Sequence, residues 1–159
     1  MSFLVALDSS DYAYKIVDYL ASNVQKDVHI TLFTVLDNVD ELVDKLKYHP
    51  EFSGDVQEIR KAYIRHASNL RELMEKCKQI LIKAGIPEEN IKISAQTKKI
   101  GIARDIIQEA ERGEYDTIVV GRRGASGISS FLFGSVSNKV VQHLKDLTIW
   151  IIESDLSTK

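Results

Sequence analysis

Residues 116–135 read DTIVVGRRGASGISSFLFGS, and this stretch predicts a strand, a glycine-rich turn and the start of a helix in succession. The apolar run DTIVV is typical of a strand in a sheet that is covered on both faces. Four of the eight glycines in the chain follow it, at positions 121, 124, 127 and 134. Glycine lets main-chain N–H groups approach an anion because it has no Cβ. With the N-terminus of the helix expected from Ser135, the segment predicts a phosphate-binding turn. A surface loop that simply collects glycines is the alternative.

The rest of the chain repeats this alternation of strand and helix. The expected strands are residues 3–7, 28–35, 90–96, 116–120 and 147–152, and the expected helices are 13–24, 56–84, 102–112 and 135–145. The polar segment between the second strand and the long helix carries one short helical piece near residues 41–47. The pattern predicts an α/β fold in which residues 1–159 form one domain, with an open parallel five-stranded sheet and helices on both faces.

Two polar turns suggest the order of the strands. Ligands of open α/β sheets bind beyond the carboxyl ends of the strands, where the strand order reverses. The turn Asp8-Ser9-Ser10 follows the first strand, and the glycine segment follows the fourth. If both line one site, these two strands are neighbours, which favours the order 3-2-1-4-5 over the flavodoxin-like order 2-1-3-4-5.

Composition narrows the class of function. The 21 basic and 23 acidic residues leave a net charge of -2, which does not favour binding to nucleic acid. The sequence contains no apolar run of the roughly 20 residues that a membrane-spanning helix requires, so we expect no membrane partner. Cys77 is the single cysteine and lies at helical spacing with apolar residues, which predicts a buried thiol and a cytoplasmic protein.

The better-known phosphate and metal motifs are absent from the sequence. It has neither the P-loop pattern nor a G-x-G-x-x-G after the first strand. The third expected strand ends near Ala95-Gln96 without the acidic cluster of a receiver domain. The four histidines, at positions 29, 49, 66 and 143, show no spacing typical of metal ligands, so no metal site built from them is expected.

The spacing of Gly121, Gly124, Gly134 and Ser135 resembles the nucleotide-binding signature of the universal stress protein family: glycine, two residues, glycine, nine residues, glycine and serine or threonine. Three further segments are similar to that family. They are FLVALDSS (3–10), HITLFTV (29–35) and IARDIIQEAERGEYDTIVVGRRG (102–124). The resemblance implies the 3-2-1-4-5 sheet and, because every position of the signature is retained, membership of the ATP-binding branch.

The resemblance also implies a set of site residues. Asp8 and Val35 would border the adenosine, Asp8 through its carboxylate and Val35 through main-chain groups. Ribose and phosphates would lie along Val120, Gly121, Arg123 and Gly124, and the phosphates would be held by Gly134, Ser135, Val136 and Ser137. The ligand would be ATP with Mg²⁺, or AMP or ADP. Spacing leaves open which of Arg122 and Arg123 faces the ligand, and Asp8 or Asp11 could instead cap the first helix.

Two classes of function fit these residues. The first is a regulatory module whose loop and helix start, residues 121–137, are ordered by the nucleotide, so that an unknown protein partner meets a different surface. The second is an enzyme that hydrolyses ATP slowly or transfers a phosphoryl group, although the sequence offers no convincing general base. A dimeric stress protein without nucleotide is a further alternative. Strand 147–152 is apolar on both faces, which predicts a homodimer through this edge.

Overall fold

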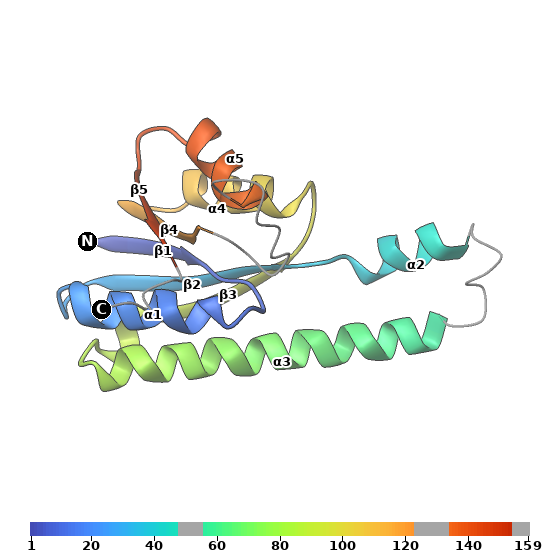
Figure 1. Cartoon of the computed structure of the whole chain (residues 1–159), viewed down its shortest axis with the longest axis horizontal. Coiled ribbons are helices and arrows are strands. Elements are labelled where there is room, and N and C mark those ends of the chain that lie inside the picture. Colours follow the sequence, from blue (N-terminus) through green and yellow to red (C-terminus); the bar gives the residue numbers. More distant parts are fainter. Residues whose placement is uncertain (48–55, 123–133, 154–159) are drawn as a thin grey trace.

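Five parallel strands form one sheet in the computed structural model, which describes residues 1–47, 56–122 and 134–153 (Figure 1). The strands are β1 (Ser2–Ala6), β2 (His29–Leu36), β3 (Ile91–Thr97), β4 (Thr117–Gly121) and β5 (Thr148–Ile152). Their order is β3-β2-β1-β4-β5, which confirms the predicted fold class and strand order. The order of connection therefore reverses between β1 and β4.

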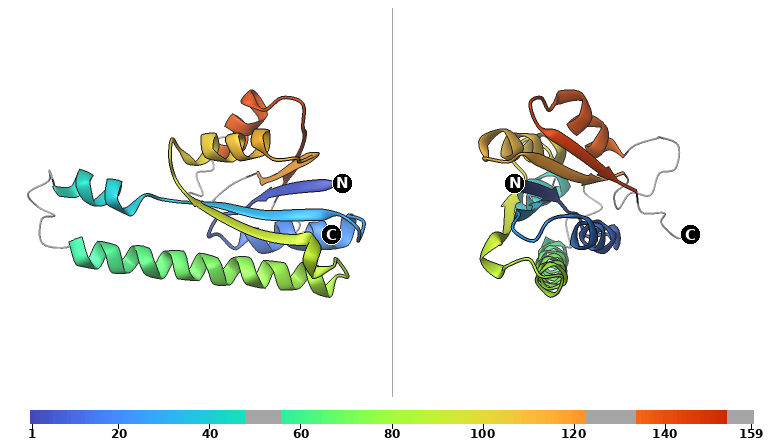
Figure 2. Two further views of the ribbon diagram at one scale, coloured as in Figure 1. Left: turned by 180° about the vertical axis from the view of Figure 1, so that it is seen from behind. Right: turned by 90° about the vertical axis from the view of Figure 1, so that its left-hand side faces the viewer.

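Helices cover both faces of this sheet (Figure 2). The helices are α1 (Tyr12–Asn23), α2 (Val39–Lys47), α3 (Val56–Lys83), α4 (Ile102–Arg112) and α5 (Ser135–His143), with a short 3-10 turn η2 at Glu88–Asn90. Helices α1 and α3 pack together on one face, and α4 and α5 pack together on the other. This division follows from right-handed crossovers that run in opposite directions from β1 and from β3.

The alternation of side chains along the central strands divides the core into two clusters. Phe3 and Val5 of β1 point into the cluster under α1 and α3, whereas Leu4 points into the cluster under α4 and α5. Both faces of β1 are buried, as expected of a central strand in a parallel sheet. Cys77 lies in the first cluster with no exposed surface, which confirms the predicted buried thiol.

The long helix α3 extends past the sheet. Its 28 residues span about 42 Å at 1.5 Å per residue, and Leu70 is the first buried residue that it contributes. Its N-terminal half lies with α2 beyond the carboxyl ends of the strands (Figure 1). Gly85 follows the helix with a φ of 97°, a left-handed conformation that glycine adopts without steric cost. The predicted stop at Gly85 is thus explained.

The predicted element bounds differ from the observed ones by a few residues. Helix α5 ends at His143 rather than at residue 145, because Leu144 has left the helical conformation and is extended. The short helical piece near 41–47 is α2, which begins at Val39. Within the described residues, no helix is both long enough and apolar enough to cross a lipid bilayer.

Candidate functional site

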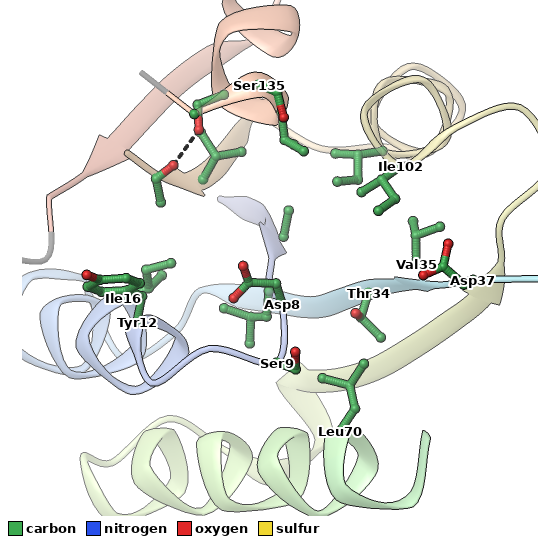
Figure 3. A pocket seen from close by; sticks show the side chains of 18 of the residues that line it. Asp8, Ser9, Tyr12, Ile16, Thr34, Val35, Asp37, Leu70, Ile102 and Ser135 are labelled. Atoms are coloured by element: carbon green, nitrogen blue, oxygen red, sulfur yellow. Dashed lines mark hydrogen bonds between the residues drawn. The ribbon is translucent and has the colours of Figure 1, made fainter. Parts of the chain in front are cut away.

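A cavity of about 470 Å³ lies at the carboxyl ends of β1, β2 and β4, where the strand order reverses (Figure 3). This volume is within the range of small-molecule sites. The turn after β1 forms its centre, and the first turn of α5 and the start of α4 form one wall. Residues of α1 and α3 form the opposite wall. The turn after β1 and the two described ends of the glycine segment, Gly121 and Gly134, therefore line one cavity.

Eight of the ten predicted site residues line this cavity. They are Asp8, Val35, Val120, Gly121, Gly134, Ser135, Val136 and Ser137. The other two, Arg123 and Gly124, lie outside the described residues, as does Gly127. Residues that are 129 positions apart in the chain, Asp8 and Ser137, thus come together around one space.

The main chain of Val35 faces the cavity. Leu7 donates an N–H bond of 2.9 Å to the carbonyl of Phe33, and Lys98 donates one of 2.6 Å to the carbonyl of Leu36. Phe33 therefore directs its main-chain groups toward β1, and Leu36 directs its own toward β3. Because main-chain groups alternate between the two sides of a strand, those of Val35 also face the β1 side. The pairing between β1 and β2, however, ends at Ala6 opposite Phe33. Its N–H and C=O thus form a donor–acceptor pair beyond the end of β1.

Main-chain donors of α5 face the cavity from another side. The amide of Asn138 bonds to the carbonyl of Gly134 at 2.9 Å. The amides of Ser135, Val136 and Ser137 precede that bond, in the part of a helix whose N–H groups have no helical partner. The helix dipole adds partial positive charge at this end. This wall of the cavity is therefore suited to an anion.

Ser137 joins the end of β4 to the start of α5. The residue is 3% exposed, and its hydroxyl donates a hydrogen bond to the carbonyl of Gly121. A hydroxyl has only one proton to donate. The Ser137 hydroxyl therefore holds two walls of the cavity together, and its proton is not directed at a ligand.

Arg122 is directed away from the cavity. Its side chain forms an ion pair with Glu153 just after β5, and its N–H bonds to the carbonyl of Ile152 at 2.8 Å. The amide of Gly134 in turn bonds to the carbonyl of Arg122 at 2.7 Å. Arg122 therefore connects β4, β5 and the residue before α5, and among the described residues that line the cavity there is neither a lysine nor an arginine.

Asp8 lies in the middle of the cavity (Figure 3). Its Oδ1 accepts hydrogen bonds from the main-chain N–H of Ser10, at 3.0 Å, and from the Ser10 hydroxyl. These bonds form an Asx-type turn that fixes the carboxylate at the end of β1. Asp11 occupies the cap position of α1 without a side-chain capping bond. The Asp8 bonds thus reach Ser10, the residue before the cap position of α1.

A second carboxylate, that of Asp37, lines the cavity next to Val35 (Figure 3). Its Oδ1 accepts a bond of 2.7 Å from the ammonium group of Lys98. This bond is the main cause that raises the pKa of Lys98 above its ordinary value. The loop that carries Lys98 is itself held by buried Asp105. The Asp105 carboxylate accepts hydrogen bonds from the main-chain N–H groups of Lys99, at 2.7 Å, and Ile100, at 3.1 Å.

Several lining residues were missed by the sequence reasoning. They are Tyr12 and Ile16 of α1, His66 and Leu70 of α3, Ile102 and Ile106 of α4, Thr34 of β2, and Asp37, which follows β2. Helical periodicity identifies the apolar side of α3 but not the turn that reaches the ends of the strands. For Asp37 a signal was available, because it follows the second strand as directly as Asp8 follows the first. Among the described residues, no group of three or more His, Cys, Asp or Glu side chains is placed to hold a metal ion.

Comparison with known proteins shows a match along most of the chain. The model of the Universal stress protein family matches residues 1–146. Universal stress protein YxiE of Bacillus subtilis is 29% identical over 147 residues, which cover 87% of this chain and 90% of that protein. Universal stress protein UspA from Lactobacillus plantarum has a similar solved structure, with a TM-score of 0.69, 22% identity and coverage of 96% and 97% of the two chains.

Two other solved structures of similar fold contain adenine nucleotides. One is the universal stress protein from Archaeoglobus fulgidus in complex with dAMP, with a TM-score of 0.57, 18% identity and coverage of 96% and 97%. The other is a universal stress protein in complex with cAMP, with a TM-score of 0.58, 18% identity and coverage of 96% of each chain. At these identities the likeness shows the fold alone.

Proposed function

This chain belongs to the universal stress protein family, and on that premise we propose that it is a regulatory protein that binds an adenine nucleotide in the cavity at the β1–β4 switch point. The main support is the pair of opposed main-chain walls. The Val35 N–H and C=O match the Watson–Crick edge of adenine, which accepts at N1 and donates from its 6-amino group. The amides at the start of α5 suit the phosphates. The related proteins in complex with dAMP and cAMP support the same ligand class.

ATP with Mg²⁺ is the proposed physiological ligand. The residues present fit such a group, because donors on α5 face the phosphate end while the Asp8 carboxylate lies in the same cavity. A carboxylate repels a triphosphate unless a cation lies between them, and Mg²⁺ commonly binds through one carboxylate and phosphate oxygens. The cation would neutralise phosphate charge when bound. Asp8, which the resemblance places beside the adenosine, would in this proposal hold the cation instead, and α5 would orient the phosphates.

A regulatory role is favoured over rapid catalysis. Phosphoryl transfer needs a positioned nucleophile or water and strong neutralisation of charge at the transferred group. The described lining contributes the carboxylates of Asp8 and Asp37 and the imidazole of His66, without a lysine or arginine. His66 lies on α3, on the wall opposite α5. In this proposal nucleotide binding alters the surface that a protein partner meets near the end of β4 and the start of α5, and hydrolysis is slow.

Calorimetric titration with ATP, with AMP and with ATP plus Mg²⁺ tests this function. Gly134 lines the cavity at a φ of -63°, which a valine can adopt, so Gly134→Val adds side-chain volume where phosphates would lie. We expect the wild type to bind and this variant to lose most of its affinity. Gly101→Val is the matched control, because a Cβ at Gly101 meets no atom within 4 Å. Absence of heat or thermal shift with every nucleotide would refute the proposal.

Two further parts of the proposal concern assembly and location. Strand β5 is at the edge of the sheet, and Ile149, Trp150 and Ile151 are only partly buried by the rest of the chain. We propose that a second copy pairs with this edge, since an apolar edge strand favours pairing. We also propose a cytoplasmic location, which suits a protein whose single cysteine is unpaired and buried.

A further inference from the structure

The Asp37 carboxylate lies at the edge of the cavity, where its side chain is 59% exposed and bonded to the ammonium group of Lys98. It follows β2 directly, two residues after Val35, and Figure 3 shows it beside Val35 and near Ile102. The bonds from Lys98 to Asp37 and to the carbonyl of Leu36 hold this corner from the β3 side. Asp105 fixes the loop that supplies Lys98. The carboxylate is therefore a pre-positioned acceptor next to the main-chain pair of Val35.

The chain direction decides what this acceptor would meet. Along β2 the Val35 N–H comes first, then its C=O, then Asp37. An adenine that accepts the Val35 N–H at N1 places its 6-amino group at the Val35 C=O. One amino hydrogen is then used by the carbonyl, and the other is directed further along the chain, the direction in which Asp37 follows Val35.

We propose that Asp37 is a specificity-determining residue that accepts a hydrogen bond from the exocyclic amino group of the bound base. This inference rests on the proposed nucleotide function and names the feature of the ligand that is read. A carboxylate accepts but does not donate when ionised. Hypoxanthine has a carbonyl oxygen in place of the 6-amino group and a proton on N1, so its nucleotide would mismatch the Val35 pair and also face Asp37 without a donor. The pocket thus selects adenine over its closest isostere.

The experiment compares the dissociation constants of AMP and IMP for the full chain and for two variants of Asp37. The wild type should prefer AMP. In Asp37→Asn the amide can donate to the oxygen of hypoxanthine, and we expect the preference for AMP over IMP to fall roughly tenfold, the scale of one hydrogen bond to a charged group. Asp37→Ala should weaken the binding of AMP while leaving the binding of IMP nearly unchanged. Thermal melting of each variant shows that it is folded.

Asp40→Asn is the matched control. Asp40 is an exposed aspartate of α2 that pairs with Arg60 at 2.9 Å and does not line the cavity, so its replacement removes the same charge without touching the base. Its AMP to IMP ratio should equal that of the wild type. If both nucleotides bind but the ratio of their dissociation constants is unchanged in Asp37→Asn, the proposed role of Asp37 is wrong, while the proposed binding of a nucleotide stands. If neither nucleotide binds the wild type, both proposals fail.

Discussion

The hydroxyl of Ser137 donates a hydrogen bond to the carbonyl of Gly121, and this single contact joins the first turn of α5 to the last residue of β4. The two residues form adjacent walls of the cavity. The amides at the start of α5 therefore keep a fixed direction relative to the ends of the strands. Ser137 is in this way a positioning residue of the proposed site.

Replacement of Ser137 by alanine should lower the stability of the fold. The change removes a buried donor and leaves the Gly121 carbonyl without it, so we expect a loss of about 1 kcal/mol in the free energy of unfolding. Urea denaturation measures this difference. Ser68→Ala, on an exposed position of α3, should leave stability within about 0.5 kcal/mol of the wild type. Equal values for both variants would remove the structural role of Ser137.

Asp105 should be more sensitive than the other acids of α4. It is fully buried, and its carboxylate accepts hydrogen bonds from the main-chain N–H groups of Lys99 and Ile100. Asp105→Asn replaces one of the two acceptor oxygens by a donor. We expect a loss of about 2 kcal/mol, typical of hydrogen bonds to a charged group. The comparison is Glu111→Gln, an exposed acid of the same helix. A loss no larger than that of Glu111→Gln would contradict this account of the β3–α4 loop.

The Cys77 thiol should not react in the folded protein. Burial raises its pKa from 9.0 to about 12, so at pH 8 it stays a neutral thiol, which is a poor nucleophile. A disulfide reagent should give no absorbance change with native protein and one equivalent after unfolding. Because the folded state holds the proton more tightly, this group's contribution to stability is complete below about pH 9 and declines between pH 9 and 12. Rapid native labelling would show that the site opens.

The dimer proposal has a specific test in β5. The main-chain N–H of Thr148 donates to the carbonyl of Asp116, and the carbonyl of Ile152 accepts from the N–H of Arg122. The main-chain polar groups of Thr148 and Ile152 therefore face β4. By alternation Ile151 directs its N–H to the open edge. Ile151→Pro removes that donor and leaves the bonds to β4 in place. We expect a dimer for the wild type and a monomer for the variant in sedimentation velocity at micromolar concentration. A monomeric wild type would refute the proposal.

Much of the fold could be predicted because the central strands are strongly patterned. The run DTIVV and the polar turns after β1 and β4 were enough to predict that these strands are neighbours, since a ligand site needs both at one edge. The contribution of α3 could not be predicted in the same way. His66 and Leu70 are separated from β2 by a helix and by residues 48–55, and the position at which α3 crosses the strand ends depends on tertiary packing.

The direction of Arg122 also depends on contacts that spacing does not encode. Spacing left open which of Arg122 and Arg123 faces a ligand, and in the structure the Arg122 side chain pairs with Glu153, 31 positions later. The residue beside it, Arg123, lies outside the described residues. Spacing indicates which residues approach a ligand as a group, whereas the partner of each side chain depends on which chain ends meet across the sheet.

The most direct measurement of the central claim is an NMR titration of isotopically labelled protein with AMP, followed by the backbone amide resonances. The account predicts saturable shifts that are largest at Val35 and at Ser135, Val136 and Ser137, with smaller shifts on the exposed part of α3. Gly134→Val should abolish these shifts while the spectrum stays that of a folded protein. Saturable shifts confined to other parts of the molecule, or no shifts at millimolar AMP, would contradict the claim that this cavity binds an adenine nucleotide.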